Sequence, residues 1–150
     1  MTKPSLVSDL GRGVLASTVG TAAMTVFQRA IEMPVTGRDE SDAPAQFAKK
    51  VLPIKSSGPL TERQLNYVAH FGIGTMWGMA FAIAARTGLR GQKAVHVVFP
   101  VVLTGDILLN TALRLYKPST WTKQEWIVDL VDKYVQAQAT GAVFERIARS

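Results

Sequence analysis

Polar side chains recur at intervals of four within the apolar stretch at residues 94–113, where Asp106 and Asn110 are followed by Arg114. The preceding apolar stretch contains one histidine, His70. If the two stretches form an antiparallel helical hairpin, positions equidistant from the turn share a depth, and Asn110 then lies level with His70. We therefore predict a buried polar cluster of His70, Asp106 and Asn110, which Arg114 joins from the membrane edge.

A carboxylate such as Asp106 at membrane depth is energetically expensive, and it marks a functional site by default. Two interpretations follow from the cluster. In the first, hydrogen bonds between helices only fix the register of the bundle. In the second, the cluster takes part in proton-linked transport or binds a ligand. The sequence leaves both interpretations open.

Other chemistries find little support in the sequence. The chain has no cysteine, which excludes disulfides, thiolate metal sites and a cysteine nucleophile. We find no nucleophile–base pair, no metal-ligand spacing and no phosphate-binding loop. We therefore expect a protein that is not an enzyme and that holds neither a metal ion nor a cofactor.

The formal net charge of the 150-residue chain is +6. Its basic residues do not gather with aromatic residues in a stripe, so we expect no binding to nucleic acid. An anionic membrane surface suits the same charge. We therefore expect the lipid bilayer, and anionic lipids in particular, to be the partner that the charge attracts.

The elements that must position the cluster are helices. Apolar or semi-apolar segments cover residues 13–27, 65–85, 94–113 and 122–148, and residues 41–52 have the pattern of a short amphipathic helix. Thr122 and Glu125 have the spacing of a capping box at the start of the last segment. We predict an all-α fold, a single integral membrane domain of about four helices over residues 1–150, with the short helix between the first and the second.

Two of the long segments depart from an ordinary membrane span. Residues 13–27 are fewer than the roughly 20 that cross the hydrocarbon layer, so we expect this helix to extend to Ile31. The last segment carries Asp129, Asp132 and Lys133 in its first half. We expect that half to lie partly outside the lipid.

Small residues follow one face of the helix that carries His70. Gly74, Gly78 and Ala82 continue the same spacing of four, and Gly20 and Gly141 belong to similar stripes on other segments. Glycine in a helix interior costs about 1 kcal/mol relative to alanine. Close helix packing in lipid supplies a compensating reason, and we predict that these residues pack helix against helix.

The polar connection after the first helix contains Arg38 and Ser41. It is either a solvated connector or a site for an anionic group. A guanidinium forks onto phosphate or carboxylate, and free backbone amides at a helix start favour an anion. The second interpretation predicts that Arg38 and Ser41 bind lipid head groups.

Three stretches, GTAAMTVFQ, MPVTGRDESDAPA and NYVAHFGIGTMWGMAFA, resemble small multi-helix bacterial membrane proteins akin to the YagU-like inner-membrane family. The resemblance covers residues 13–115, and it depends on the Thr-Gly-Arg-x-x-Ser-x-x-Pro loop and the His-x-x-x-Gly-x-x-x-Gly helix. It implies a multi-pass protein of the bacterial inner membrane. It implies no catalytic residue and no ligand.

Two functional hypotheses follow. In the first, the chain is a non-enzymatic membrane protein that acts through helix packing, as a homo-oligomer or as an accessory subunit of a larger membrane complex. In the second, it is a small proton-linked transporter or a ligand-binding membrane protein centred on Asp106. A soluble helical bundle is a further alternative that fractionation would test.

Overall fold

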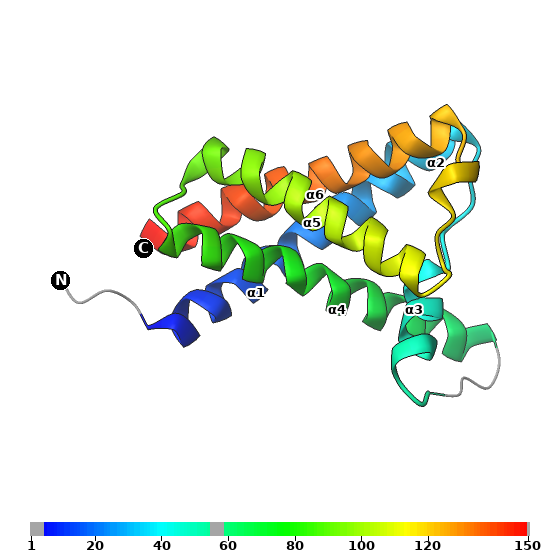
Figure 1. Cartoon of the computed structure of the whole chain (residues 1–150), viewed down its shortest axis with the longest axis horizontal. Helices are drawn as coiled ribbons and strands as arrows, with labels where there is room; N and C mark the ends of the chain where they lie inside the picture. Colours follow the sequence, from blue (N-terminus) through cyan, green and yellow to red (C-terminus); the bar gives the residue numbers. More distant parts are fainter. Residues whose placement is uncertain (1–4, 55–58, 150) are drawn as a thin grey trace.

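A computed structural model describes residues 5–54 and 59–149, and every regular element in these two ranges is helical, as the sequence predicts (Figure 1). The elements in chain order are α1 (Leu6–Phe27), a π-helical turn (Gln28–Glu32), α2 (Met33–Thr36), α3 (Ala43–Val51), α4 (Pro59–Arg86), α5 (Gly91–Ala112), a 3-10 turn (Pro118–Thr120) and α6 (Lys123–Arg149). The four long helices therefore form the bundle, and α3 is the short helix expected between the first two of them.

Three helical stretches are long and apolar enough to cross a membrane: Leu6–Thr36, Thr61–Arg86 and Gly91–Ala112. The first is longer than α1 because the π-helical turn and α2 continue it without a break, to 31 residues. The expected extension beyond Phe27 is thus confirmed. Helix α6 is not among these candidate spans.

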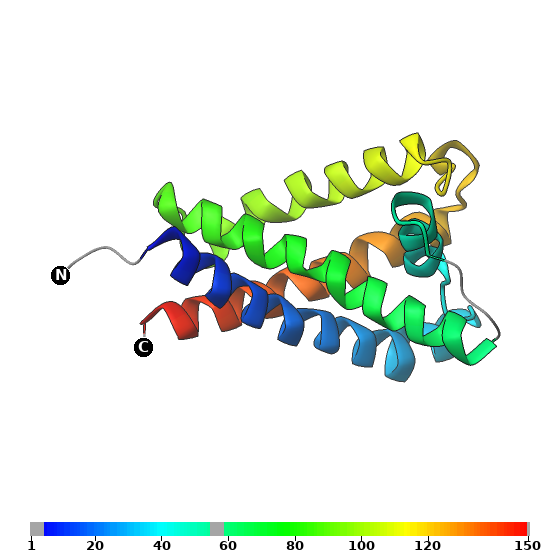
Figure 2. The ribbon, with the colours of Figure 1, turned by 90° about the horizontal axis from the view of Figure 1, so that it is seen from below.

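The bundle is tight at one end and open at the other. Helices α1, α4 and α6 run alongside one another, whereas α5 diverges from α4 after the turn that joins them (Figure 2). Helix α3 and the segment before it lie at the open end, between the C-terminal end of α5 and the start of α4 (Figure 2). The divergence of α5 leaves the space that the polar side chains line.

Local sequence signals fix the ends of the long helices. Thr122 and Glu125 form the expected capping box, because the Thr122 amide donates to Glu125 Oε2 at 2.6 Å and the Glu125 amide donates to Thr122 Oγ1 at 3.2 Å. Gly88 and Gly91 have positive φ angles, 91° and 54°, in the turn between α4 and α5. Glycine tolerates this left-handed conformation, so the two glycines allow the tight turn between α4 and α5.

The glycines of the expected packing stripes lie between helices of the same chain. Gly78 packs against Gly13 so closely that a Cβ atom on Gly78 would overlap the Gly13 carbonyl oxygen. The other glycines also contact neighbouring helices: Gly74 contacts Thr21, Gly20 contacts Thr140, and Gly141 contacts Val95 and Phe81. Ala82 is fully buried. These residues therefore lie at contacts between helices of one molecule, where α1 meets α4 and α6 and where α6 meets α4 and α5.

Helix α6 turns its polar residues inward. Asp132 and Gln136 are only 5% and 3% exposed, whereas Ile127 is 60% exposed and Val131 is 41% exposed. The Gln136 side-chain amide donates to Thr21 Oγ1 on α1 at 2.9 Å, inside the bundle. A soluble amphipathic helix buries its apolar face, whereas α6 buries these polar side chains together with the apolar Val128, Ala137 and Phe144.

Candidate functional site

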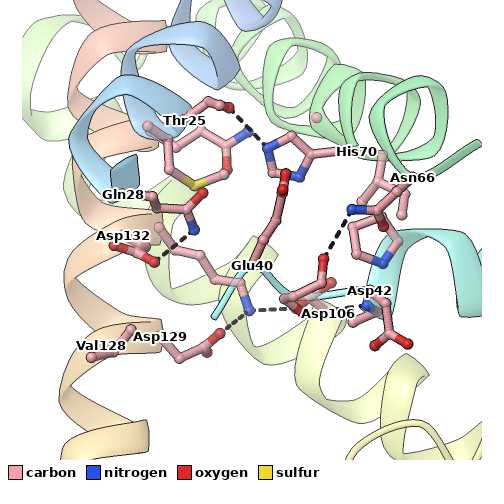
Figure 3. Close-up of a pocket in the computed structure, with 18 of the residues that line it drawn as sticks. Thr25, Gln28, Glu40, Asp42, Asn66, His70, Asp106, Val128, Asp129 and Asp132 are labelled. Carbon is pink, nitrogen blue, oxygen red and sulfur yellow. Dashed lines mark hydrogen bonds and ion pairs between the residues drawn. The ribbon is translucent and has the colours of Figure 1, made fainter. Parts of the chain in front are cut away.

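A cavity of about 400 Å³ lies at the open end of the bundle (Figure 3). Its walls come from α1 and the π-helical turn, from α4, α5 and α6, and from the segment that precedes α3. The ionisable side chains among its described lining residues are Arg29, Glu32, Arg38, Asp39, Glu40, Asp42, Tyr67, His70, Asp106, Tyr116, Glu125, Asp129, Asp132 and Lys133. These residues come from distant parts of the sequence, and the fold brings them to one place.

Lys133 is the centre of an ion network on the cavity wall. Its Nζ atom donates to Asp106 Oδ2 at 2.6 Å and to Asp129 Oδ1 at 2.7 Å. The side chains of Lys133, Asp106 and Asp129 are 13%, 16% and 19% exposed. Asp129 and Lys133 are one helical turn apart on α6, and Asp106 comes from α5, so the network connects the diverging helix to the rest of the bundle.

Asn110 holds the carboxylate of Asp106 from its own helix. Its side-chain amide donates to Asp106 Oδ1 at 3.0 Å and to the Asp106 carbonyl oxygen at 2.9 Å. Both carboxylate oxygens of Asp106 are therefore engaged, one by an amide and one by an ammonium group. This arrangement fixes the orientation of the Asp106 side chain on the cavity wall.

An aromatic ring covers the other side of the ammonium group. Lys133 Nζ lies 5.5 Å from the centroid of the Tyr116 ring, within the range of a cation–π contact. Tyr116 follows α5, and burial raises the pKa of its phenol to about 12. The Tyr116 hydroxyl is therefore neutral at physiological pH and is able to donate a hydrogen bond toward the cavity.

Asp132 is a second buried carboxylate, one turn along α6 from Asp129. Its Oδ2 accepts a hydrogen bond of 2.7 Å from the side chain of Gln28 (Figure 3). Gln28 opens the π-helical turn that continues α1. Single-turn π-helices of this kind are frequent at functional sites, because the extra residue redirects nearby side chains.

His70 lines the same cavity from α4. Its Nε2 atom is 3.2 Å from Thr25 Oγ1 on α1, so its direct partner is α1 and not α5 (Figure 3). Within the described residues, no group of three or more His, Asp or Glu side chains is arranged to hold a metal ion. The polar groups of this cavity form hydrogen bonds and ion pairs with one another.

The structure brings three of the four predicted cluster residues to the cavity. His70, Asp106 and Asn110 all line it. Arg114 does not, because α5 ends at Ala112 and Arg114 adopts a left-handed conformation, φ 59°, that leaves its side chain exposed. The predicted place of Arg114 depends on a helical spacing of four from Asp106 and Asn110, and α5 ends before that spacing reaches Arg114.

The residues of the predicted anion site lie at the cavity but have partners within the chain. Arg38 forms an ion pair of 3.8 Å with Glu32. Ser41 Oγ accepts from the amide of Ala43 at 3.2 Å, and the Ser41 carbonyl oxygen accepts from Asn66 at 2.9 Å. Both residues therefore hold the connection between α2 and α3, and their geometry gives no separate support to a lipid head-group site.

Sequence reasoning missed the contribution of α6. Relative to Asp129, the residues Asp132, Lys133 and Gln136 stand three, four and seven positions further on, the spacing of residues on one helix face. This spacing was a usable signal for a polar face that is turned toward Asp106. Gln28 carried no comparable signal, because its place depends on the π-helical turn.

Comparison of the chain with family models, with curated proteins and with solved structures gave no match in any of the three searches.

Proposed function

We propose that the chain is a non-enzymatic, multi-pass membrane protein whose cavity around Asp106 binds a small polar ligand, and that it resides in the bacterial inner membrane, as its resemblance implies. One observation carries the proposal: an ion network of Asp106, Asp129 and Lys133 lines a cavity enclosed by helices with apolar outer surfaces. Helices that turn polar groups inward and apolar groups outward suit a lipid environment.

The position of the network favours ligand binding over a purely structural role. Hydrogen bonds that only fix helix register need direct contact between helices and no open space. Asp106 and Lys133 instead border a cavity of about 400 Å³, which is within the usual size range of small-molecule sites. Charged groups that converge on such a space are able to orient a polar ligand.

The small residues of the packing stripes give no support to a function that depends on helices of a second protein. Gly78 and Gly20 contact helices of their own chain, so these surfaces are already occupied. Binding to a partner subunit would have to use other residues. The cavity is therefore the better-supported basis for function.

The test is fragment binding to the purified chain in detergent micelles. Saturation-transfer NMR with alkylammonium salts, carboxylates and neutral sugars would report which fragments enter the cavity. We expect at least one fragment class to bind the wild-type chain, and we expect Asp106→Asn to weaken that binding by about tenfold or more, since the variant removes a charge from the cavity wall and an ion-pair partner from Lys133.

Asp9→Asn is the matched control. Asp9 is also an ion-paired, half-buried aspartate, with Arg86 at 2.8 Å, but it lies on α1 and does not line the cavity. Fragment binding should be the same in Asp9→Asn as in the wild type. Absence of binding by every fragment class, or equal binding in the Asp106 and Asp9 variants, would refute a ligand site at Asp106.

A further inference from the structure

We infer that the ligand of this cavity is a small organic cation with at least one N–H group, an alkylammonium compound, and that Asp132 is its counter-ion. The inference rests on the proposed ligand-binding function and adds the chemical class of the ligand. It follows from the charge of the cavity wall, from the pairing of the cations on that wall, and from two buried carboxylate oxygens without a hydrogen-bond partner in the part of the chain that the structure describes.

The cavity wall is acidic although the chain is basic. Eight Asp or Glu residues and three Lys or Arg residues are among the described lining residues, against a net charge of +6 for the whole chain. A cavity with an excess of one charge concentrates ligands of the opposite charge. The excess of carboxylates therefore favours a cation over an anion.

Each basic side chain on the wall is already engaged. Arg29 pairs with Glu40 at 3.1 Å, Arg38 pairs with Glu32 at 3.8 Å, and Lys133 bridges two aspartates. An anionic ligand would compete with these carboxylates for the same cations. A cation meets no such competition at the carboxylates that remain.

Asp132 is the buried carboxylate on the wall for which the described residues supply no cation. Gln28 satisfies its Oδ2, but its Oδ1 has no hydrogen-bond partner among the described residues. One turn away, Asp129 Oδ2 is also buried without a partner there, since Lys133 engages only the other oxygen. Buried carboxylate oxygens are normally satisfied, so this face of α6 is able to accept further hydrogen bonds from a donor.

The aromatic residues of the wall suit the same ligand. The chain's own cations already lie over two of its rings, Arg29 at 5.4 Å from the Tyr67 centroid and Lys133 at 5.5 Å from that of Tyr116. Trp77 and Trp121 also line the cavity. An ammonium ligand that combines a carboxylate with an aromatic face would repeat an arrangement that the chain uses twice.

The test is calorimetric titration of the purified full chain in detergent micelles with ethylammonium, tetramethylammonium and acetate. We expect ethylammonium to bind and acetate not to bind. Tetramethylammonium carries the same charge but has no N–H group to give to Asp132, so we expect it to bind about tenfold more weakly or worse. This comparison uses only the wild-type chain and does not depend on how a variant folds.

The variant arm compares Asp132→Asn with Asp9→Asn. We expect Asp132→Asn to weaken ethylammonium binding by about tenfold or more and Asp9→Asn to leave it unchanged. Equal binding of ethylammonium by both variants, or equal binding of the two ammonium probes by the wild type, would overturn the inference. Binding of acetate alone would overturn the cationic class yet keep a ligand-binding cavity, whereas binding of no probe would count against the proposed function as well.

Discussion

Lys133→Met is expected to lower the free energy of unfolding by about 3–5 kcal/mol, the range seen when one partner of a buried ion pair is removed. The Lys133 ammonium group forms ion pairs with both Asp106 and Asp129, whose side chains are both less than one-fifth exposed. Methionine keeps most of the volume and leaves the two carboxylates without a cation. Reversible unfolding in mixed dodecylmaltoside and SDS micelles, followed by circular dichroism, would measure the loss.

Two companion variants separate the network from a general loss of charge. Lys93→Met removes a lysine that is exposed on α5, and we expect it to change stability by less than about 0.5 kcal/mol. Adding Asp106→Asn and Asp129→Asn to Lys133→Met should recover much of the lost stability, because no unpaired charge is then left in the network. If Lys133→Met and Lys93→Met unfold alike, the network does not stabilise the bundle.

Gly78→Leu is expected to cause the largest packing defect, a loss of at least about 3 kcal/mol or a failure to fold. A Cβ atom added to Gly78 would overlap the backbone of Gly13 on α1. Main-chain atoms cannot move aside as a flexible side chain can. The leucine side chain would separate α4 from α1 along their contact. Thermal unfolding in dodecylmaltoside micelles, followed by circular dichroism at 222 nm, would measure the effect.

Gly72→Leu provides the comparison on the same helix. A Cβ atom on Gly72 meets nothing within 4 Å, and the residue is exposed. Since leucine is a better helix former than glycine, we expect Gly72→Leu to be neutral or to stabilise by up to about 1 kcal/mol. A Gly78→Leu chain that unfolds at the same temperature as Gly72→Leu would show that the close contact of α1 with α4 is absent.

Much of the fold was predictable because helix signals are local. The capping box of Thr122 and Glu125 marks the start of α6, and Gly88 and Gly91 mark the hairpin turn. The spacing of four in α4 also placed Gly74 and Gly78 on one packing face. Each of these signals depends on residues less than two helical turns apart, so a single sequence carries it.

The site was predictable only in part because it depends on how distant helices meet. Equal distance from the hairpin turn placed Asn110 level with His70, and both residues line the cavity, but it did not reveal that α1 supplies the partner of His70. The approach of Lys133 to Asp106 depends on the packing of α6 beside α5. The charges of α6 predict a helix partly outside the lipid, and that prediction stands beside the ion pairs that Lys133 forms with Asp106 and Asp129.

Two backbone features could not be predicted from the sequence. The π-helical turn at Gln28–Glu32 continues α1 and sets the position of Gln28 beside Asp132, and nothing in its composition distinguishes it from an α-helix. At Arg114, a non-glycine residue takes a left-handed conformation. Tertiary contacts fix such local departures, so periodicity alone gives the wrong place for the side chains that follow them.

The central claim is a bundle that lies in the bilayer with its apolar side chains outward, and cysteine labelling tests it most directly. The native chain has no cysteine, so Val101→Cys on α5, where Val101 is 65% exposed, and Lys93→Cys near the hairpin turn each give a single reactive site. The two chains would be placed in lipid vesicles and treated with a water-soluble, membrane-impermeant maleimide on both sides of the bilayer.

We expect Lys93→Cys to react in intact vesicles and Val101→Cys to remain unlabelled until SDS dissolves the lipid, because the hydrocarbon layer excludes the charged reagent. Labelling of Val101→Cys in intact vesicles at the same rate as Lys93→Cys would place the outer face of α5 in water and contradict the membrane bundle.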